Sequence, residues 1–135
     1  MTGAHGYDCT HCKLKTDAER STALSVLPPV LIITLSRFDM AAGKIMTSVP
    51  FHRQMDFSGV IYEFAGMIVH KGETQNSGHY ISYVRNPQFP GQSNWFCVND
   101  KIVTPMTDRE IDILCVAFKP TTDETPYILA FNRRV

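Results

Sequence analysis

The chain has 135 residues, of which 44% are hydrophobic, and this length and composition favour one globular domain. It carries 13 Lys plus Arg and 13 Asp plus Glu, so its formal net charge is zero. A nucleic-acid-binding domain usually has a basic excess, and we therefore expect no nucleic-acid partner. The longest apolar run, residues 26–35, is interrupted by Pro28-Pro29 and is far shorter than the roughly 18 residues of a membrane span, so we also expect no membrane partner.

The amino-terminal residues contain an informative cysteine pair. Residues 1–12 are polar and lack the apolar stretch of a secretory signal, so we expect an intracellular protein, cytoplasmic or nuclear. Two of the four cysteines form Cys9-Thr10-His11-Cys12. In an intracellular chain this CxxC spacing indicates metal or redox chemistry rather than a disulfide framework.

Mainly strands are predicted in the first half of the chain. Residues 1–12 favour a loop, and residues 16–27 are compatible with either a short helix or an extended segment. Residues 30–38 are rich in β-branched and aromatic side chains, which predicts a buried strand. Further along we expect a turn at 41–43 and strands at 44–51 and 61–70.

The second half alternates between strands and turn-rich segments. Residues 71–78 have loop composition, with two Gly plus Thr, Gln, Asn and Ser, and residues 86–94 contain two Pro and a Gly. Thr107-Asp108-Arg109-Glu110 is a capping box that predicts a short helix. The remaining predicted strands are 79–85, 95–99 and 126–132. The expected fold class is α+β with a mainly antiparallel sheet.

A histidine and an asparagine are expected to meet on two of these strands. If 79–85 and 95–99 form a hairpin, pairing Tyr83 with Trp95 places His79 opposite Asn99. The amide oxygen could then accept a hydrogen bond from Nδ1–H of the imidazole, leaving Nε2 free as a base. By spacing alone, an ordinary strand histidine is an equally good interpretation.

Several motifs, taken in order along the chain, resemble the ubiquitin-specific proteases, which are papain-like deubiquitinases. The residues that carry the resemblance are Tyr7-Asp8-Cys9 with Cys12, Leu27-Pro28-Pro29-Val30-Leu31, Ser36-Arg37-Phe38, His70-Lys71-Gly72, Ser77-Gly78-His79-Tyr80, Trp95, Asn99-Asp100, Val103, Pro126-Tyr127-Ile128-Leu129 and Phe131. The resemblance covers nearly the whole chain and implies the palm-like half of a papain-like cysteine protease fold. Residues 1–27 would be an edge segment of the fingers and residues 28–135 the palm-like sheet.

The resemblance also implies roles for individual residues. His79 is expected to be the general base and Asn99 the residue that orients it, with Asp100 as a second candidate for that role. Residues 71–78 would form a mobile loop beside the channel for the ubiquitin tail, and Gly78 and Tyr80 would flank the scissile bond. A glycine at position 78 would let the backbone of the ubiquitin tail approach the backbone of this chain closely.

The family nucleophile lies in a GNTCYxN box, and no such box occurs in this sequence. Cys97 shares the expected face of His79, but a cysteine in the middle of a strand lacks the helix N-terminus that lowers a thiol pKa. We therefore expect Cys97 and Cys115 to belong to the core. The chain by itself is predicted to be inactive.

A complete zinc site is not expected either. Structural zinc takes four ligands, and the family supplies two CxxC pairs. This chain has one such pair, Cys9 and Cys12. These two cysteines form half of a site, so we expect no cofactor unless further ligands come from elsewhere.

Three functions compete at this point. The first is part of a deubiquitinase that hydrolyses isopeptide or peptide bonds at the ubiquitin C-terminus, the second a catalytically inactive module that binds ubiquitin or another partner, and the third a small β domain with a structural His79–Asn99 pair. The expected partners are ubiquitin or a ubiquitinated protein, together with a missing N-terminal half. Without that half, apolar strands such as 30–38 and 61–70 predict self-association.

Overall fold

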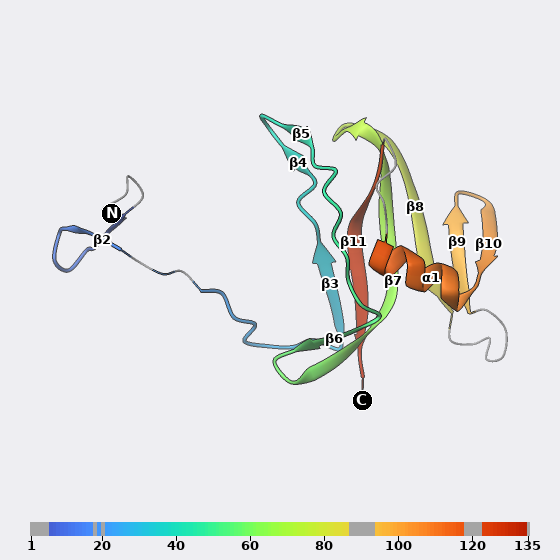
Figure 1. The fold of residues 1–135 in the computed structure, drawn as a ribbon, viewed down its shortest axis with the longest axis horizontal. Helices are drawn as coiled ribbons and strands as arrows, with labels where there is room; N and C mark the ends of the chain where they lie inside the picture. The colour runs from blue at the N-terminus through green and yellow to red at the C-terminus, as the bar shows by residue number, and fades with distance from the viewer. Residues whose placement is uncertain (1–5, 18, 20, 87–93, 118–122, 135) are drawn as a thin grey trace.

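A computed structural model describes residues 6–17, 19, 21–86, 94–117 and 123–134, and these residues form strands and one helix (Figure 1). The elements in chain order are β1 (Tyr7–Asp8), β2 (Lys15–Thr16), β3 (Val30–Thr34), β4 (Phe38–Asp39), β5 (Gly43–Lys44), β6 (Gln54–Phe57), β7 (Val60–Thr74), β8 (Ser77–Arg85), β9 (Trp95–Asn99), β10 (Ile102–Met106), α1 (Asp108–Ala117) and β11 (Glu124–Arg133). No helix within these ranges is long and apolar enough to cross a membrane.

The main sheet has the strand order β10-β9-β8-β7-β11-β3, and β6 also pairs with β7. Every pairing in it is antiparallel, which confirms the expected α+β class with a mainly antiparallel sheet. The last strand, β11, lies between β7 and β3. The centre of the sheet is therefore complete only when the end of the chain is in place.

Helix α1 lies across one face of this sheet and closes the core (Figure 1). Ile111 and Cys115 of the helix are buried together with aromatic side chains of the strands, namely Tyr62, Phe64, Trp95 and Phe131. The rings of Phe64 and Trp95 stack with centroids 5.3 Å apart. Large rings such as these bury the most apolar area per residue, so this cluster is the main source of stability.

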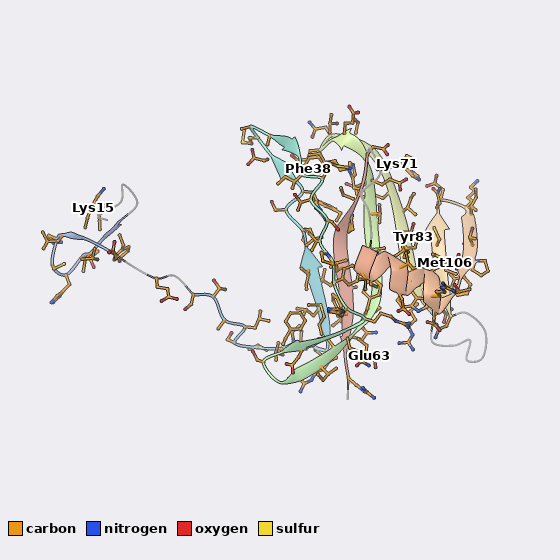
Figure 2. The ribbon with its side chains drawn as sticks, viewed as in Figure 1. Lys15, Phe38, Glu63, Lys71, Tyr83 and Met106 are labelled. Atoms are coloured by element: carbon orange, nitrogen blue, oxygen red, sulfur yellow. The ribbon has the colours of Figure 1, made fainter. Side chains whose placement is uncertain are left out.

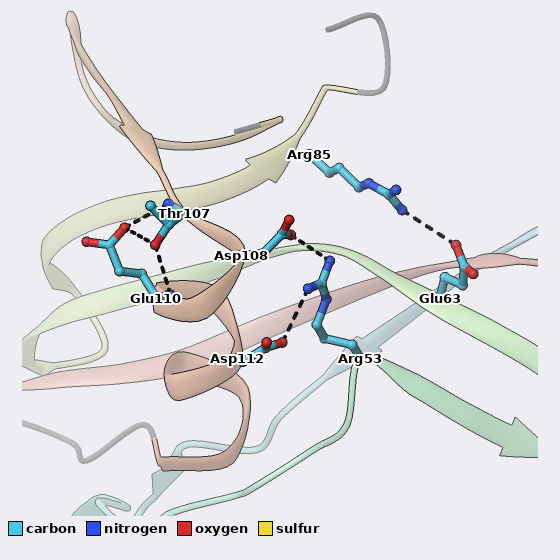
Figure 3. Close-up of polar contacts among 7 residues, drawn as sticks. All are labelled: Arg53, Glu63, Arg85, Thr107, Asp108, Glu110 and Asp112. Atoms are coloured by element: carbon cyan, nitrogen blue, oxygen red, sulfur yellow. Dashed lines mark hydrogen bonds and ion pairs between the residues drawn. The ribbon is translucent and has the colours of Figure 1, made fainter. Parts of the chain in front are cut away.

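The predicted capping box begins helix α1 (Figure 3). The backbone N–H of Glu110 donates to Oγ1 of Thr107 at 3.2 Å, and the backbone N–H of Thr107 donates to Oε2 of Glu110 at 2.7 Å. Arg53 ties the helix to the sheet, because its guanidinium contacts Asp108 at 3.0 Å and Asp112 at 3.3 Å. The Cζ atom of the same guanidinium lies 5.7 Å from the centroid of the Trp95 ring.

Two bulges keep apolar side chains on the core face. Between the pairs Ala130–Gly66 and Phe131–Phe64, strand β7 has one residue more than β11, and that residue is Ala65. Between Pro126–Val69 and Ile128–Ile68 the extra residue is on β11, which is Tyr127. A bulge reverses the alternation of side chains, so Phe64 and Met67 both reach the core although they are three positions apart.

Several local predictions were wrong because residue composition does not report pairing partners. Residues 71–78 are not a loop: β7 continues to Thr74 and β8 begins at Ser77, which leaves a tight hairpin turn. Residues 44–51 do not form a strand beyond Lys44, whereas Gln54–Phe57 form an unpredicted strand against β7. Strand β10 was missed, and it tolerates Pro105 because it lies at the edge of the sheet.

The amino-terminal segment differs from the prediction as well. Residues expected to be a loop contain strand β1, which pairs with β2 in a small hairpin that stands apart from the main sheet in Figure 1. The described residues between β2 and β3 form neither helix nor strand, so the helical alternative for residues 16–27 is not found in the described part of this segment. The predicted loop 86–94 lies largely outside the described residues, although the N–H of Asn86 donates to the carbonyl of Asn94 at 2.7 Å.

Candidate active site

His79 and Asn99 meet at the ends of two adjacent strands. His79 lies near the beginning of β8, and Asn99 is the last residue of β9. Nε2 of the imidazole lies 2.6 Å from Oδ1 of Asn99, which confirms the expected hydrogen bond. Because Oδ1 can only accept, Nε2 carries the proton and Nδ1 keeps its lone pair.

Two details of this contact differ from the prediction. Tyr83 pairs with Cys97 and Arg85 with Trp95, so the expected Tyr83–Trp95 register was wrong by two residues. A shift of two preserves the face of every side chain, and for this reason His79 still reaches Asn99 on the next strand. The prediction that Nδ1 bonds the asparagine was also wrong, because Nε2 makes the bond and Nδ1 is the nitrogen that Asn99 leaves free.

Asp100 lies beside this pair but makes a weaker contact. Its Oδ2 is 3.9 Å from Nε2 of His79, and its side chain is 78% exposed. Asp100 has a φ of +52° in the turn that joins β9 to β10, a conformation that Asp and Asn tolerate better than most residues. Its position is therefore explained by the turn, and Asn99 is the better placed of the two to hold the imidazole.

Positions 78 and 80 face the side of the sheet opposite to the His79 side chain, because neighbouring residues of a strand alternate between faces. A Cβ atom on Gly78 would lie 2.4 Å from Nε2 of His70 and 2.4 Å from the carbonyl oxygen of Lys71. The absence of a side chain at Gly78 is thus already required within the chain, and not only by an approaching substrate. The Tyr80 ring is half exposed and lies 5.1 Å from the ring of His70.

The cysteines of the sheet and helix differ in their burial. Burial raises the pKa of Cys115 to about 12, and its thiol belongs to the core as expected. Cys97 is partly buried rather than fully buried and pairs with Tyr83 on β8. Burial, reinforced by the neighbouring Cys97, raises the pKa of the Tyr83 hydroxyl to about 12. Figure 2 shows Tyr83 beside helix α1, where it packs against the core.

Comparison with known proteins identifies the family of this chain. The model of the family described as ubiquitin carboxyl-terminal hydrolase matches residues 4–131. The chain belongs to the ubiquitin carboxyl-terminal hydrolase family. Its members are ubiquitin-pathway thiol proteases, and His79 and Asn99 both lie within the matched residues.

Relatives of this chain are longer proteins. Ubiquitin carboxyl-terminal hydrolase 25 of Arabidopsis thaliana is 28% identical over 144 residues, which cover 98% of this chain and 20% of that protein. Ubl carboxyl-terminal hydrolase 18 of Mus musculus is 31% identical over 144 residues, covering 93% of this chain and 38% of that protein. The chain therefore spans well under half the length of these relatives.

The fold agrees with solved structures of the same family. Ubp8 in the SAGA DUB module with Sgf11, Sus1 and Sgf73, bound to monoubiquitin, matches with a TM-score of 0.70 at 28% identity, covering 98% of this chain and 29% of that chain. The same module bound to ubiquitin aldehyde matches with a TM-score of 0.70 at 25% identity, covering 98% and 30%. The mostly antiparallel sheet with one helix is thus an arrangement found in a ubiquitin-specific protease domain.

The CxxC pair of this chain lies in the turn between β1 and β2. The backbone amides of Cys12 and His11 point at the Cys9 sulfur and hold the pKa of that thiol below its ordinary value. A depressed pKa favours the thiolate, which is the form that binds a metal ion. Within the described residues, however, no group of three or more His, Cys, Asp or Glu side chains could hold a metal ion.

Sequence reasoning gave no function to two residues that lie close to the β7–β8 hairpin, Lys44 and His70. Lys44 reaches three backbone carbonyls at the end of β7 and the beginning of β11, and the buried ring of His70 lies against Gly78. In the sequence His70 belongs only to the motif His70-Lys71-Gly72 that carries the family resemblance, and Lys44 belongs to no motif. A lone lysine in a turn-rich segment gives no local signal, because its carbonyl partners are 26 or more positions away in the sequence.

Proposed function

We propose that this chain is part of a cysteine-type deubiquitinase that hydrolyses isopeptide or peptide bonds at the ubiquitin C-terminus. The observation that carries the proposal is the 2.6 Å hydrogen bond between Nε2 of His79 and Oδ1 of Asn99, inside the residues matched by the family model. We propose that residues 28–135 are the palm-like half of a papain-like fold. Residues 1–27 are then an edge segment of the fingers.

In the proposed reaction His79 acts through Nδ1. The hydrogen bond to Asn99 fixes the tautomer with a proton on Nε2, so the lone pair on Nδ1 can take the proton of a cysteine thiol supplied from outside this chain. The resulting thiolate attacks the carbonyl carbon of the last glycine of ubiquitin and breaks its bond to the leaving nitrogen. The imidazolium returns its proton to the leaving lysine amine, and water then hydrolyses the thioester.

Gly78 and Tyr80 are proposed to border the channel for the ubiquitin tail. They flank His79 in sequence, and the Tyr80 ring is half exposed and stands beside His70 and Tyr127. Asp100 is proposed as an auxiliary group near the imidazole. The proposed location is intracellular, cytoplasmic or nuclear, which suits a chain whose four cysteines are all free thiols.

We propose that Cys9 and Cys12 are half of a structural zinc site. Amide donors to Cys9 favour the thiolate, which agrees with a ligand role. A tetrahedral site needs two further ligands from another segment. The chain by itself is therefore proposed to have no cofactor, and equilibrium dialysis against zinc should give only weak binding.

The test of the catalytic proposal joins this chain, in one polypeptide, to the nucleophile-bearing segment of a ubiquitin-specific protease. Release of a fluorescent amine from a ubiquitin C-terminal amide is then measured. We expect turnover that falls by about 10²–10⁴-fold in His79→Ala, the usual contribution of a general base, and by less in Asn99→Ala. The matched control is His52→Ala, because His52 is exposed on the surface and should be dispensable.

Two results would contradict this assignment. If the joined protein still turns over substrate after His79→Ala, His79 is not the general base. Turnover by the isolated chain, abolished by Cys97→Ser, would show that the partly buried Cys97 is a nucleophile after all.

A catalytically inactive module that binds ubiquitin or another partner is the second candidate. The absence of a GNTCYxN box from the sequence favours it. In this case titration of labelled ubiquitin or a ubiquitin-like modifier with the chain should shift NMR signals equally for wild type and His79→Ala. Joining a nucleophile-bearing segment should then give no turnover.

A further inference from the structure

Lys44 makes an unusual set of contacts for a lysine. Its Nζ donates to the carbonyl oxygens of His70 at 3.1 Å and Gly72 at 2.7 Å, and also to that of Asp123. The N–H of Gly72 donates to the same Asp123 carbonyl at 3.0 Å. One partly buried ammonium therefore joins the β4–β5 hairpin to the end of β7 and to the residue before β11. Figure 2 shows Phe38 of β4 and Lys71 of β7 at this same end of the molecule.

His70 lies between this ammonium and the strand that carries His79. Its side chain is 2% exposed, and its Nδ1 has no hydrogen-bond partner among the described residues. Phe38 covers the ring edge-on, with ring centroids 5.5 Å apart. On its other side the ring touches Gly78, where any added Cβ would overlap Nε2.

The backbone around Gly78 is held with little freedom. Gly72 has a φ of +134°, and a Cβ on Gly72 would lie 2.9 Å from Cα of Gly78. Lys71 pairs directly with His79 across the hairpin. The backbone that carries His79 is thus held at two places. The Lys44 ammonium bonds the carbonyls of the paired strand β7, and the His70 ring packs against Gly78 on the face opposite the His79 side chain.

We infer that Lys44 and His70 are positioning residues for the proposed base. They hold the β7–β8 backbone so that the His79 imidazole keeps its hydrogen bond to Asn99. The inference rests on the proposed function and names two residues of the same site. Both act through backbone, because neither contacts the imidazole of His79. Loss of either should release the hydrogen bond between Nε2 and Oδ1 without removing any atom of the pair.

Burial and nearby charges act on both titratable groups of this cluster. Burial lowers the pKa of Lys44, the carboxylates of Asp123 and Glu124 oppose that shift, and Arg37 adds to it. Burial also lowers the pKa of His70, and the charge of Lys44 acts in the same direction. With its pKa held below the ordinary value, the His70 ring is neutral at neutral pH.

The test measures the tautomer of His79 by NMR in the ¹⁵N-labelled chain at pH 8, without ubiquitin or a nucleophile. We expect Lys44→Met and His70→Ala each to lower the ratio of Nε2–H to Nδ1–H tautomer about fivefold, as for loss of one ordinary hydrogen bond. The matched control is Lys71→Met. It removes an ammonium from the same strand end, but one that forms a 3.2 Å surface ion pair with Glu124 and no carbonyl bond.

A second measurement uses the unmodified chain, in case Lys44→Met does not fold. A lysine ammonium bonded to three carbonyls exchanges its protons slowly, so Lys44 should give a visible ¹⁵N–¹H signal at neutral pH, unlike the exposed lysines. Its absence, or an unchanged His79 tautomer in a folded Lys44→Met chain, would overturn the inference. The deubiquitinase proposal would survive either result, because it is tested separately by the turnover measurements under Proposed function.

Discussion

The two faces of the main sheet are made by the same strands but have different surroundings. On the face covered by α1, Tyr62, Trp95 and Phe131 are each 0% exposed. On the opposite face Ile32 is 63% exposed and Val30 is 52% exposed, and a hollow of about 400 Å³ is lined mainly by small and aliphatic side chains. One face is a protein core and the other is an apolar surface.

This contrast shows that strand sequence alone does not decide burial. Val30–Thr34 is apolar on both faces, a pattern typical of strands that are covered on both sides. Among the described residues a covering element lies on one side only, apart from the end where Phe38 and Tyr127 approach His70. The open face is consistent with the partner segment or self-association expected from the sequence.

The largest expected effect compares one residue from each face. Phe131→Ala should lower the free energy of unfolding by about 3–5 kcal/mol, because it empties a fully buried position between Phe51 and Phe64. Ile32→Ala should change it by less than about 0.5 kcal/mol, as for other exposed positions. Urea unfolding of both variants measures the difference. Equal losses would mean that the open face is covered in solution.

The second prediction concerns His70, the buried titratable group at the covered end of the open face. Burial, with a further contribution from Lys44, lowers its pKa in the folded chain, whereas the unfolded chain titrates near the ordinary value of about 6.5. As the pH falls below about 6.5 the unfolded state binds the proton first, so stability is complete above this pH and decreases below it. Unfolding midpoints between pH 8 and 5.5 should show the decrease.

The control for this pH dependence is a second histidine. His52→Gln should keep the decrease, because His52 is exposed. His70→Phe should reduce it, since no titratable ring then remains at that position. A His70→Phe profile that matches wild type would assign the pH dependence to other groups.

The third prediction concerns the helix that makes the two faces different. Thr107→Ala should lower the free energy of unfolding by about 1 kcal/mol, because the backbone N–H of Glu110 loses its acceptor. Thr107→Ser keeps the hydroxyl and should be close to wild type. Thermal unfolding compares the two variants, and equal melting temperatures would show that the capping box does not contribute in solution.

The smallest effect on stability is expected for a charge placed on the open face. Ile32→Lys should leave the unfolding midpoint nearly unchanged but reduce self-association, because the exposed apolar surface is what favours contact between copies. Sedimentation velocity at micromolar concentration compares it with wild type. A monomeric wild-type chain would contradict the association expected from the uncovered strands.

Sequence reasoning was most successful where the signal was local. The capping box at Thr107 located the beginning of α1, and the run of β-branched residues located β3. It failed where the structure depends on a distant partner: Gln54–Phe57 is a strand because β7 lies beside it, and residues 71–78 continue a ladder in spite of their loop-like composition. The register of β8 and β9 was wrong by two residues for the same reason.

The sequence by itself determined the family, the α+β class and the identity of the His79–Asn99 pair, because the motifs that carry them are contiguous stretches of residue types. Only the tertiary structure decided which imidazole nitrogen bonds the amide, since that depends on the ring's approach across two strands. It also showed that the His70 ring leaves no room for a side chain at position 78, and that Lys44 bonds carbonyls at the end of β7. These contacts join residues far apart in the chain, and no local pattern encodes such distances.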